Sequence, residues 1–177
     1  MKKILEQVIL AFDDILTMVH YKKGEVVQEY STKSNKVYIV KSGILRSYYF
    51  QNGNDVTAHF ALEYSIIGAV DSLLKKKRSI YSIEALEDSE VLWLDYNEME
   101  CFLDQNPKFE RQARQVSQLL YLDLVERLEG MMFLSAKERY DHFLSRYPNL
   151  IQKVNLGHIA SYLGISQETL SRVRKLK

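Results

Sequence analysis

The polar side chains between residues 166 and 175 could read and hold a nucleic acid. Gln, Glu and Arg side chains can hydrogen-bond to base edges in the major groove of DNA, and Ser, Thr, Arg and Lys side chains can bind phosphates. The segment carries both kinds: Ser166, Gln167, Glu168, Thr169, Ser171, Arg172, Arg174 and Lys175. This chemistry requires that one rigid element present the side chains together.

The apolar residues around this segment are spaced as two short helices. Two helical stripes follow one another in the sequence: Ile159, Ala160 and Leu163, then Leu170 and Val173. Gly164 lies between the stripes and can take the positive φ angle that ends a helix. Asn155 and Ser166 are suited to cap the first turns of the two helices, because each offers a side-chain oxygen to unpaired backbone amides. The spacing therefore predicts a helix-turn-helix.

A solvated surface helix on a small helical bundle is the alternative interpretation, since paired helices are also a common packing unit. The charge distribution favours nucleic-acid binding. From residue 134 onward the chain has eight Lys or Arg residues and three Asp or Glu residues, a net charge of +5, whereas the preceding residues carry −4. A basic segment suits phosphate contact, because each neutralised phosphate releases bound counterions.

Length and composition indicate a folded, soluble protein with one sizeable domain and a small one. The chain has 177 residues, of which 46% are hydrophobic. It has no run of about 18 apolar residues that would span a membrane, and its first 16 residues read as an amphipathic helix. Cys101 is the only cysteine, which excludes an internal disulfide, a cysteine zinc site and a four-cysteine iron–sulfur cluster within one chain. We expect a cytoplasmic location.

Short alternating runs between Val19 and Leu94 predict β-strands rich in Val, Ile, Tyr and Phe. The runs are EVVQEY (25–30), KVYIVKSG (36–43), ILRSYYF (44–50), DVTAHFAL (55–62), SIYSIEAL (79–86) and EVLWLD (90–95). Asn52-Gly53 is a strong hairpin signal, because both residues tolerate positive φ angles. Strands of this length with intervening turns favour an antiparallel sandwich or roll.

A long helical pattern follows the strands. Residues 96–105 are helical in pattern, Pro107 restarts the chain, and residues 108–129 form one amphipathic helix. The apolar face of that helix is wider than one contact surface requires, so we expect it to pack on its own domain and also on a second copy of the chain. The alternative is a helix buried within one monomer. Ser135 and Glu138 then form a capping box for another helix, which Pro148 ends.

This order of parts resembles the Crp/Fnr family of bacterial transcription regulators. The resemblance covers essentially the whole chain and is carried by YKKGEVV, VYIVKSGILRSYY, YSIIGAVDSLL and IASYLGISQETLSR, with matches at Gly24, Gly43 and Gly68. It implies an α+β fold with an N-terminal β-roll of the cyclic-nucleotide-binding type at 1–106, a dimerisation helix at 107–133 and a helix-turn-helix domain at 134–177. We see no wing before the chain ends at Lys177.

The resemblance also implies roles for individual residues. Gln167, Glu168 and Arg172 match the base-reading positions of the second helix, and their side chains suit adenine, cytosine and guanine respectively. The remaining polar residues are expected at phosphates: Asn155, Ser166, Thr169, Ser171, Arg174 and Lys175. The implied partners are a near-palindromic double-stranded DNA, a second copy of the chain, RNA polymerase and an unidentified small-molecule effector.

The effector site departs from the pattern of nucleotide-binding members. Ala69 follows Gly68 where those members carry a glutamate for the ribose, although Arg78 and Ser79 could imitate their phosphate-binding pair. The basic run at 75–78 is equally well a solvated loop. We therefore name Gly68, Ala69, Arg78 and Ser79 as a candidate effector pocket but predict no cofactor and no cyclic AMP binding.

Two other classes of protein have weaker support. A metal-dependent cupin enzyme has a similar roll, but His59 and Glu63 are the only hint of a ligand pair, and the four histidines share no metal-ligand spacing. No glycine-rich phosphate loop or nucleophile motif indicates catalysis, so we predict no catalytic residues and no metal site. The second alternative is a nucleotide- or small-molecule-sensing module that acts through a protein partner.

Overall fold

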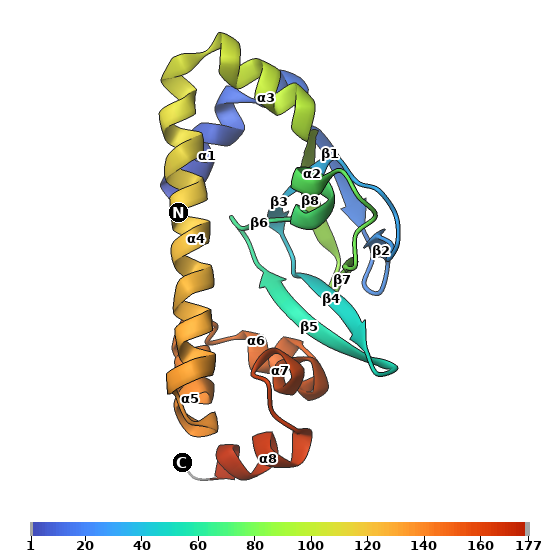
Figure 1. The fold of residues 1–177 in the computed structure, drawn as a ribbon, viewed down its shortest axis with the longest axis vertical. Coiled ribbons are helices and arrows are strands. Elements are labelled where there is room, and N and C mark those ends of the chain that lie inside the picture. The colour runs from blue at the N-terminus through green and yellow to red at the C-terminus, as the bar shows by residue number, and fades with distance from the viewer. Residues whose placement is uncertain (1, 176–177) are drawn as a thin grey trace. The chain divides into compact units, whose positions relative to one another are not determined.

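The structure is a computed structural model that describes residues 2–175. In this part of the chain the strands are β1 (Thr17–Tyr21), β2 (Val26–Gln28), β3 (Lys36–Ser42), β4 (Leu45–Gln51), β5 (Asn54–Ala61), β6 (Ile66–Gly68), β7 (Ser82–Ala85) and β8 (Ser89–Asp95). The α-helices are α1 (Lys2–Ala11), α2 (Val70–Lys75), α3 (Tyr96–Gln105), α4 (Pro107–Phe133), α5 (Ala136–Arg146), α6 (Leu150–Lys153), α7 (Leu156–Tyr162) and α8 (Gln167–Lys175). Figure 1 shows their order along the chain.

The strands form the predicted antiparallel roll. Two four-stranded sheets have the strand orders β1-β8-β3-β6 and β2-β7-β4-β5, and every pairing is antiparallel. Strands of both sheets contribute to one buried cluster: Tyr38, Val40, Leu45, Ala61, Ile67, Ile83, Ala85 and Val91. The alternation of apolar and polar residues therefore reflects one face toward this core and one face away from it.

The hairpin signal at Asn52-Gly53 is confirmed. Both residues have positive φ angles, 52° and 80°, and they connect β4 to β5 with Gln51 paired to Asn54. A two-residue loop with two positive φ angles matches the right-handed twist of the strands that it joins.

Three short elements of the roll were not predicted from the sequence. β1 lies at the edge of its sheet and is mostly exposed, so its residues show no strong apolar alternation. β6 and α2 span three and six residues, which is too short for a periodic pattern. The predicted strand at 25–30 contracts to β2, whose register shifts between Val26 and Gln28.

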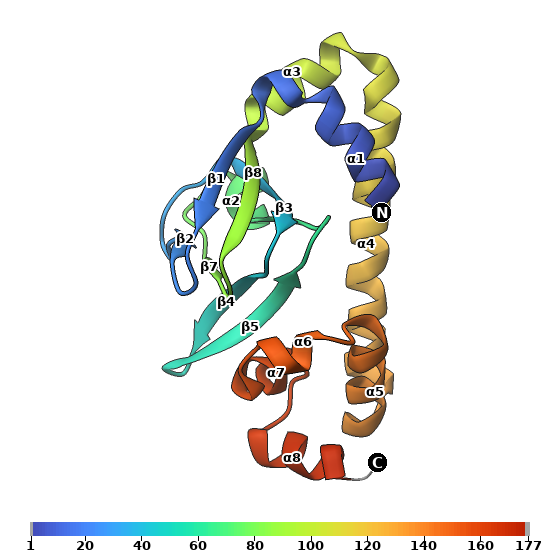
Figure 2. The same ribbon diagram turned by 180° about the vertical axis from the view of Figure 1, so that it is seen from behind.

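The chain divides into two compact units, residues 1–119 and 120–177, and the boundary falls inside α4. In the first unit, α1 runs beside the first half of α4 (Figures 1 and 2), and Gln112 donates a hydrogen bond to Gln7. Helix α4 extends from Pro107 to Phe133, beyond the predicted end at residue 129. The division of the sequence at 106 and 133, with 107–133 as a dimerisation segment, stays a prediction.

The second unit is helical, as the sequence predicts. α5 begins at the expected capping box, in which the side chains of Ser135 and Glu138 each accept the backbone N–H of the other residue, and it ends at Arg146 before Pro148. Buried side chains from α5 to α8 form its core: Tyr140, Phe143, Leu150, Ile159, Ala160, Leu163, Leu170 and Val173. The expected absence of a wing concerns the chain end at Lys177, which lies outside the described residues.

Candidate functional site

Helices α7 and α8 form the predicted helix-turn-helix. The turn between them closes as a Schellman motif, because the Ile165 N–H donates to the Ala160 carbonyl at 3.0 Å and the Gly164 N–H donates to the Ser161 carbonyl at 3.1 Å. Gly164 has a φ angle of +65°, as its position between the stripes predicts. Ala160, a member of the first predicted stripe, is buried.

Both helices start at the predicted caps. The side-chain oxygen of Asn155 accepts the Gly157 N–H at 2.8 Å, and the Ser166 hydroxyl accepts the Thr169 N–H at 3.1 Å. The first amides of a helix have no partner inside the helix, so each cap fixes the point at which its helix begins. The cap at Ser166 therefore sets which residues lie in the first turn of α8.

The residues expected to read bases are all exposed on α8. Glu168 and Arg172 lie on the side opposite to the buried stripe of Leu170 and Val173, and Gln167, three residues before Leu170, lies at the flank of that stripe. Arg172 donates a hydrogen bond of 3.3 Å to the Thr169 hydroxyl and is exposed. The amide nitrogen of Gln167 lies over Gly157, where an added Cβ would approach it to 2.8 Å. The three exposed side chains thus lie on one helix, Gln167 and Glu168 in its first turn and Arg172 in its last turn.

The residues expected at phosphates surround this set. Asn155, Ser166, Ser171, Arg174 and Lys175 are exposed, and Thr169 is partly buried. The Thr169 hydroxyl lies 3.1 Å from the Ser166 hydroxyl, so these two side chains form a local bridge as well as the cap. Arg172, Arg174 and Lys175 make the last turn of α8 strongly basic. The arrangement offers hydroxyl and cationic groups to an anion along one helix.

Two arginines outside the motif hold it in the second unit, and sequence reasoning missed them. Arg139 of α5 donates to the Leu163 carbonyl at 3.0 Å and to the Leu134 carbonyl at 2.8 Å. Arg127 of α4 donates to the Tyr162 carbonyl at 3.4 Å and stacks on the Tyr162 ring. The last carbonyls of a helix lack partners within it, so both arginines stabilise the end of α7. These contacts join residues 24 and 35 positions apart, which no local pattern reveals.

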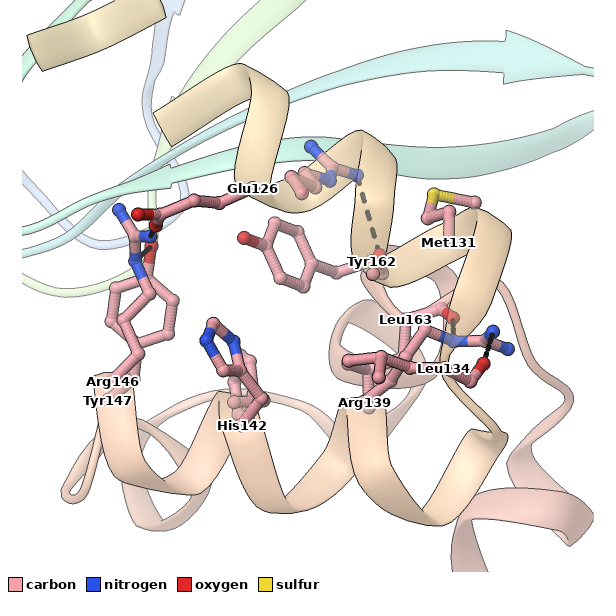
Figure 3. A pocket seen from close by; sticks show the side chains of 12 residues that line it. Glu126, Met131, Leu134, Arg139, His142, Arg146, Tyr147, Tyr162 and Leu163 are labelled. Carbon is pink, nitrogen blue, oxygen red and sulfur yellow. Dashed lines mark hydrogen bonds and ion pairs between the residues drawn. The ribbon is translucent and has the colours of Figure 1, made fainter. Parts of the chain in front are cut away.

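The cavity beside these arginines is small. It has a volume of about 50 Å³ and lies among α4, α5 and α7 of the second unit (Figure 3). That space is large enough for only a few water molecules, whereas small-molecule sites usually occupy several hundred Å³. Around it, Arg146 forms ion pairs with Asp123 and Glu126. Burial, and then the neighbouring Tyr162, raise the pKa of Tyr147, so its phenol stays neutral. We interpret this region as a packing contact that holds α4, α5 and α7 together, and not as a ligand site.

The candidate effector residues lie in one region of the roll, from the end of β6 to the loop before β7. Gly68 ends β6, and an added Cβ there would approach the Lys36 carbonyl to 3.2 Å. Ala69 and Ser79 are buried, whereas Arg78 is exposed. The Ser79 hydroxyl donates to Asp71, and Arg78 donates to the Ser31 carbonyl. Both side chains therefore bind groups of the protein itself.

In the part of the chain that the structure describes, His59 and Glu63 belong to no group of metal-ligating side chains. Within residues 2–175, no three His, Cys, Asp or Glu side chains are positioned to hold a metal ion together. Over the same residues, none of the helices combines the length and the apolar character needed to cross a membrane.

Comparison with known proteins agrees with this architecture. The family described as "Cyclic nucleotide-binding domain" matches residues 18–106, half of the chain. A curated relative, electron transport regulator A of Shewanella oneidensis, is 25% identical over 167 residues, which cover 86% of this chain. The chain spans only 65% of the length of that relative.

Solved structures share the fold at low sequence identity. FixK2 from Bradyrhizobium japonicum matches with a TM-score of 0.78 and 20% identity, over 92% of this chain and 84% of its own. A protein of Eubacterium rectale described as a transcriptional regulator of the Crp/Fnr family matches with a TM-score of 0.69 and 21% identity, over 94% and 80%. The roll, the long helix and the helix-turn-helix thus occur together in these relatives as they do here. The chain belongs to the cyclic nucleotide-binding domain family, and its fold is similar to that of these solved regulators.

Proposed function

We propose that this protein is a transcription regulator that binds double-stranded DNA as a homodimer. One observation carries the proposal: Gln167, Glu168 and Arg172 are exposed together on a capped helix whose apolar stripe, Leu170 and Val173, is buried in the second unit. A helix of this kind can enter the major groove, where such side chains distinguish base pairs. The names of the matched relatives, an electron transport regulator and a Crp/Fnr regulator, support a regulatory role.

The proposed dimer rests on the second half of α4. Several large apolar residues there are more than half exposed: Tyr121 (69%), Leu122 (52%), Leu124 (62%), Leu128 (57%), Met132 (65%) and Phe133 (73%). Contiguous exposed apolar residues of this kind mark interaction surfaces. We propose that a second copy of the same helix covers these residues. A two-fold dimer would present two recognition helices to a near-palindromic site whose half-sites lie about one DNA turn apart.

The remaining roles follow from the family. The relatives reported above are named as regulators, and we propose the same role for this chain, without catalytic activity, in the cytoplasm and with RNA polymerase as a partner. An effector bound to the roll would act by shifting the population between two dimer arrangements. The alternative, a sensing module that acts only through a protein partner, requires no DNA contact by α8.

Selection from a random pool of DNA duplexes tests the proposal, with and without a panel of cyclic nucleotides. We expect the pool to converge on a near-palindromic sequence. A pool that shows no enrichment under any condition contradicts DNA reading and favours the sensing module.

Three single substitutions then separate base reading from phosphate binding. Arg172→Ala should cost about 1–3 kcal/mol per half-site and relax the preference at one base pair, because a bidentate contact is lost. Arg174→Ala should weaken all duplexes alike and reduce the slope of log affinity against log salt by about 2 per dimer. Arg114→Ala, at an exposed residue of α4 in the first unit, is the control and should change neither. Fluorescence anisotropy with the selected duplex and a scrambled one measures all three.

A further inference from the structure

The loop that joins β6 to β7 contains a carboxylate that is bound as an anionic ligand would be. Asp71, at the start of α2, accepts the Ser79 hydroxyl at 2.8 Å through one oxygen and the Ile80 N–H at 3.0 Å through the other. The first oxygen also accepts the Ser72 N–H at 3.0 Å. Ser79 is 1% exposed. A hydroxyl and backbone amides that converge on one carboxylate are the donors that commonly hold a phosphate or another oxyanion.

The rest of the loop does not fit a cyclic nucleotide. The methyl group of Ala69 is fully buried and cannot accept a hydrogen bond from a ribose hydroxyl. The guanidinium group of Arg78 donates to the Ser31 carbonyl at 2.7 Å and is exposed. A phosphate placed on Ser79 would meet the Asp71 carboxylate, and two like charges at that distance repel.

The loop is also fastened to the segment before β3. The Ser79 N–H donates to the Thr32 carbonyl at 2.9 Å, and the Ser31 N–H donates to the Ser79 carbonyl at 2.9 Å. The Ser34 N–H donates to the Ser72 hydroxyl at 2.9 Å. The backbone that carries the donors around Asp71 is therefore hydrogen-bonded to residues 31–34. The Asp71 carboxylate accepts the hydrogen bonds of those donors inside the loop.

We propose that Asp71 is an internal anion that replaces an effector phosphate in this loop. The roll then adopts its closed loop without a cyclic nucleotide, and the loop carries no cyclic-nucleotide site. This inference concerns only the first unit. The proposed role of Asp71 does not depend on DNA binding by α8, because its tests measure the stability and ligand binding of the roll.

Replacement of the carboxylate by free anions tests the proposal. Asp71→Gly removes the side chain and leaves the donors of Ser79 and Ile80 unpaired, so we expect its Tm to fall by about 5 °C. Inorganic phosphate or acetate should restore part of that loss, because either anion can bind the exposed donors. Asp71→Asn should lose stability without recovery, since the amide still fills the position. Thermal unfolding in sodium chloride of equal ionic strength gives the baseline.

Asp88→Gly is the matched control. Asp88 accepts the Lys23 N–H at 3.0 Å and the Lys22 ammonium group at 2.9 Å in an exposed turn of the same unit. Phosphate stabilises many proteins through exclusion from their surface, and this general effect should appear equally in wild type, Asp88→Gly and Asp71→Asn. A selective gain in Asp71→Gly supports the proposal. An unchanged Tm in Asp71→Gly, or a loss that neither anion reduces, overturns it.

Two further measurements keep the proposal testable if Asp71→Gly does not fold. In a cycle of Asp71→Asn, Ser79→Ala and the double variant, the losses should be strongly non-additive, because the two side chains bind each other. Additive losses would overturn the proposal. Calorimetric titration of the wild-type protein with cyclic AMP and cyclic GMP should show no binding at millimolar concentrations, and saturable binding of either nucleotide that Ser79→Ala abolishes would also overturn it.

Discussion

Gly24 and Gly43 impose the same backbone requirement but lie in different surroundings. Their φ angles are +86° and +97°, which side chains other than glycine rarely adopt. At Gly43 an added Cβ would lie 2.2 Å from the Ser89 hydroxyl oxygen and 2.7 Å from the Ser89 Cα, whereas at Gly24 it would meet nothing within 4 Å. The sequence alone does not distinguish these two glycines, and only the packing separates their steric demands.

Alanine at these two positions should therefore cost different amounts of stability. Gly24→Ala should lose about 1 kcal/mol, the price of the left-handed backbone alone. Gly43→Ala should lose about 3 kcal/mol or more, since the Ser89 backbone must also move. Urea denaturation followed by the fluorescence of Trp93 measures both variants in the roll. Equal losses would show that the contact with Ser89 is relaxed at no cost.

At the scale of elements, the start of α5 is specified by a four-residue pattern. The Glu138 carboxylate accepts the Ser135 N–H at 2.8 Å, and the Ser135 hydroxyl accepts the Glu138 N–H at 3.3 Å. The hydrogen bond from the Ser135 backbone holds the pKa of Glu138 below its ordinary value of 4.5. The capping box could be predicted because both partners lie within one turn of the chain.

The stability of the second unit should depend on the charge of Glu138. Because the pKa of this carboxyl is lower in the folded state than in the unfolded state, its contribution is present above the unfolded value and is lost as pH falls through the folded value. Glu138→Gln should remove that contribution, so the difference in unfolding free energy between wild type and variant should shrink from about pH 6 to about pH 3. Chemical denaturation across this range measures the difference.

Ser135→Ala provides the comparison for this element. It removes the hydroxyl that accepts the Glu138 N–H, a neutral hydrogen bond that persists in acid, and should therefore still cost about 1 kcal/mol at pH 3. A constant difference between wild type and Glu138→Gln across the pH range would contradict the assigned hydrogen bond.

At the scale of the whole molecule, the apolar side of α4 predicts a dimer. Leu124 and Leu128 lie one helical turn apart and are 62% and 57% exposed. The double substitution Leu124→Glu and Leu128→Glu should give a monomer with unchanged helix content. The proposed dimer seam is the exposed apolar side of the second half of α4, and charged residues there would repel those of the second copy. Light scattering after size-exclusion chromatography measures the mass. DNA affinity should fall by about 100-fold or more, since the two half-sites are no longer bound together.

Val26→Glu is the control for added charge at an exposed apolar residue. Val26 is 47% exposed on β2 of the roll, outside the proposed seam, and its substitution should leave the mass and the DNA affinity unchanged. A dimer that persists in the Leu124 and Leu128 variant would place the dimer contact elsewhere.

The sequence by itself determined the features that depend on neighbours along the chain. The two helical stripes, the caps at Asn155 and Ser166, the positive φ angle at Gly164 and the Asn52-Gly53 hairpin were predicted because each is set by a few consecutive residues. The set of exposed polar residues on α8 followed from the same periodicity.

Tertiary structure alone decided which distant groups meet. Arg139 donates a hydrogen bond to the Leu163 carbonyl, and Asp71 accepts one from the Ser79 hydroxyl, because packing brings together segments that are separated in the sequence. Short elements such as β6 and α2 were also fixed by pairing and burial, since three to six residues carry too little pattern of their own. Local chemistry thus specified the helix that we propose reads DNA, and long-range contacts set how that helix is held and how the loop of the roll is closed.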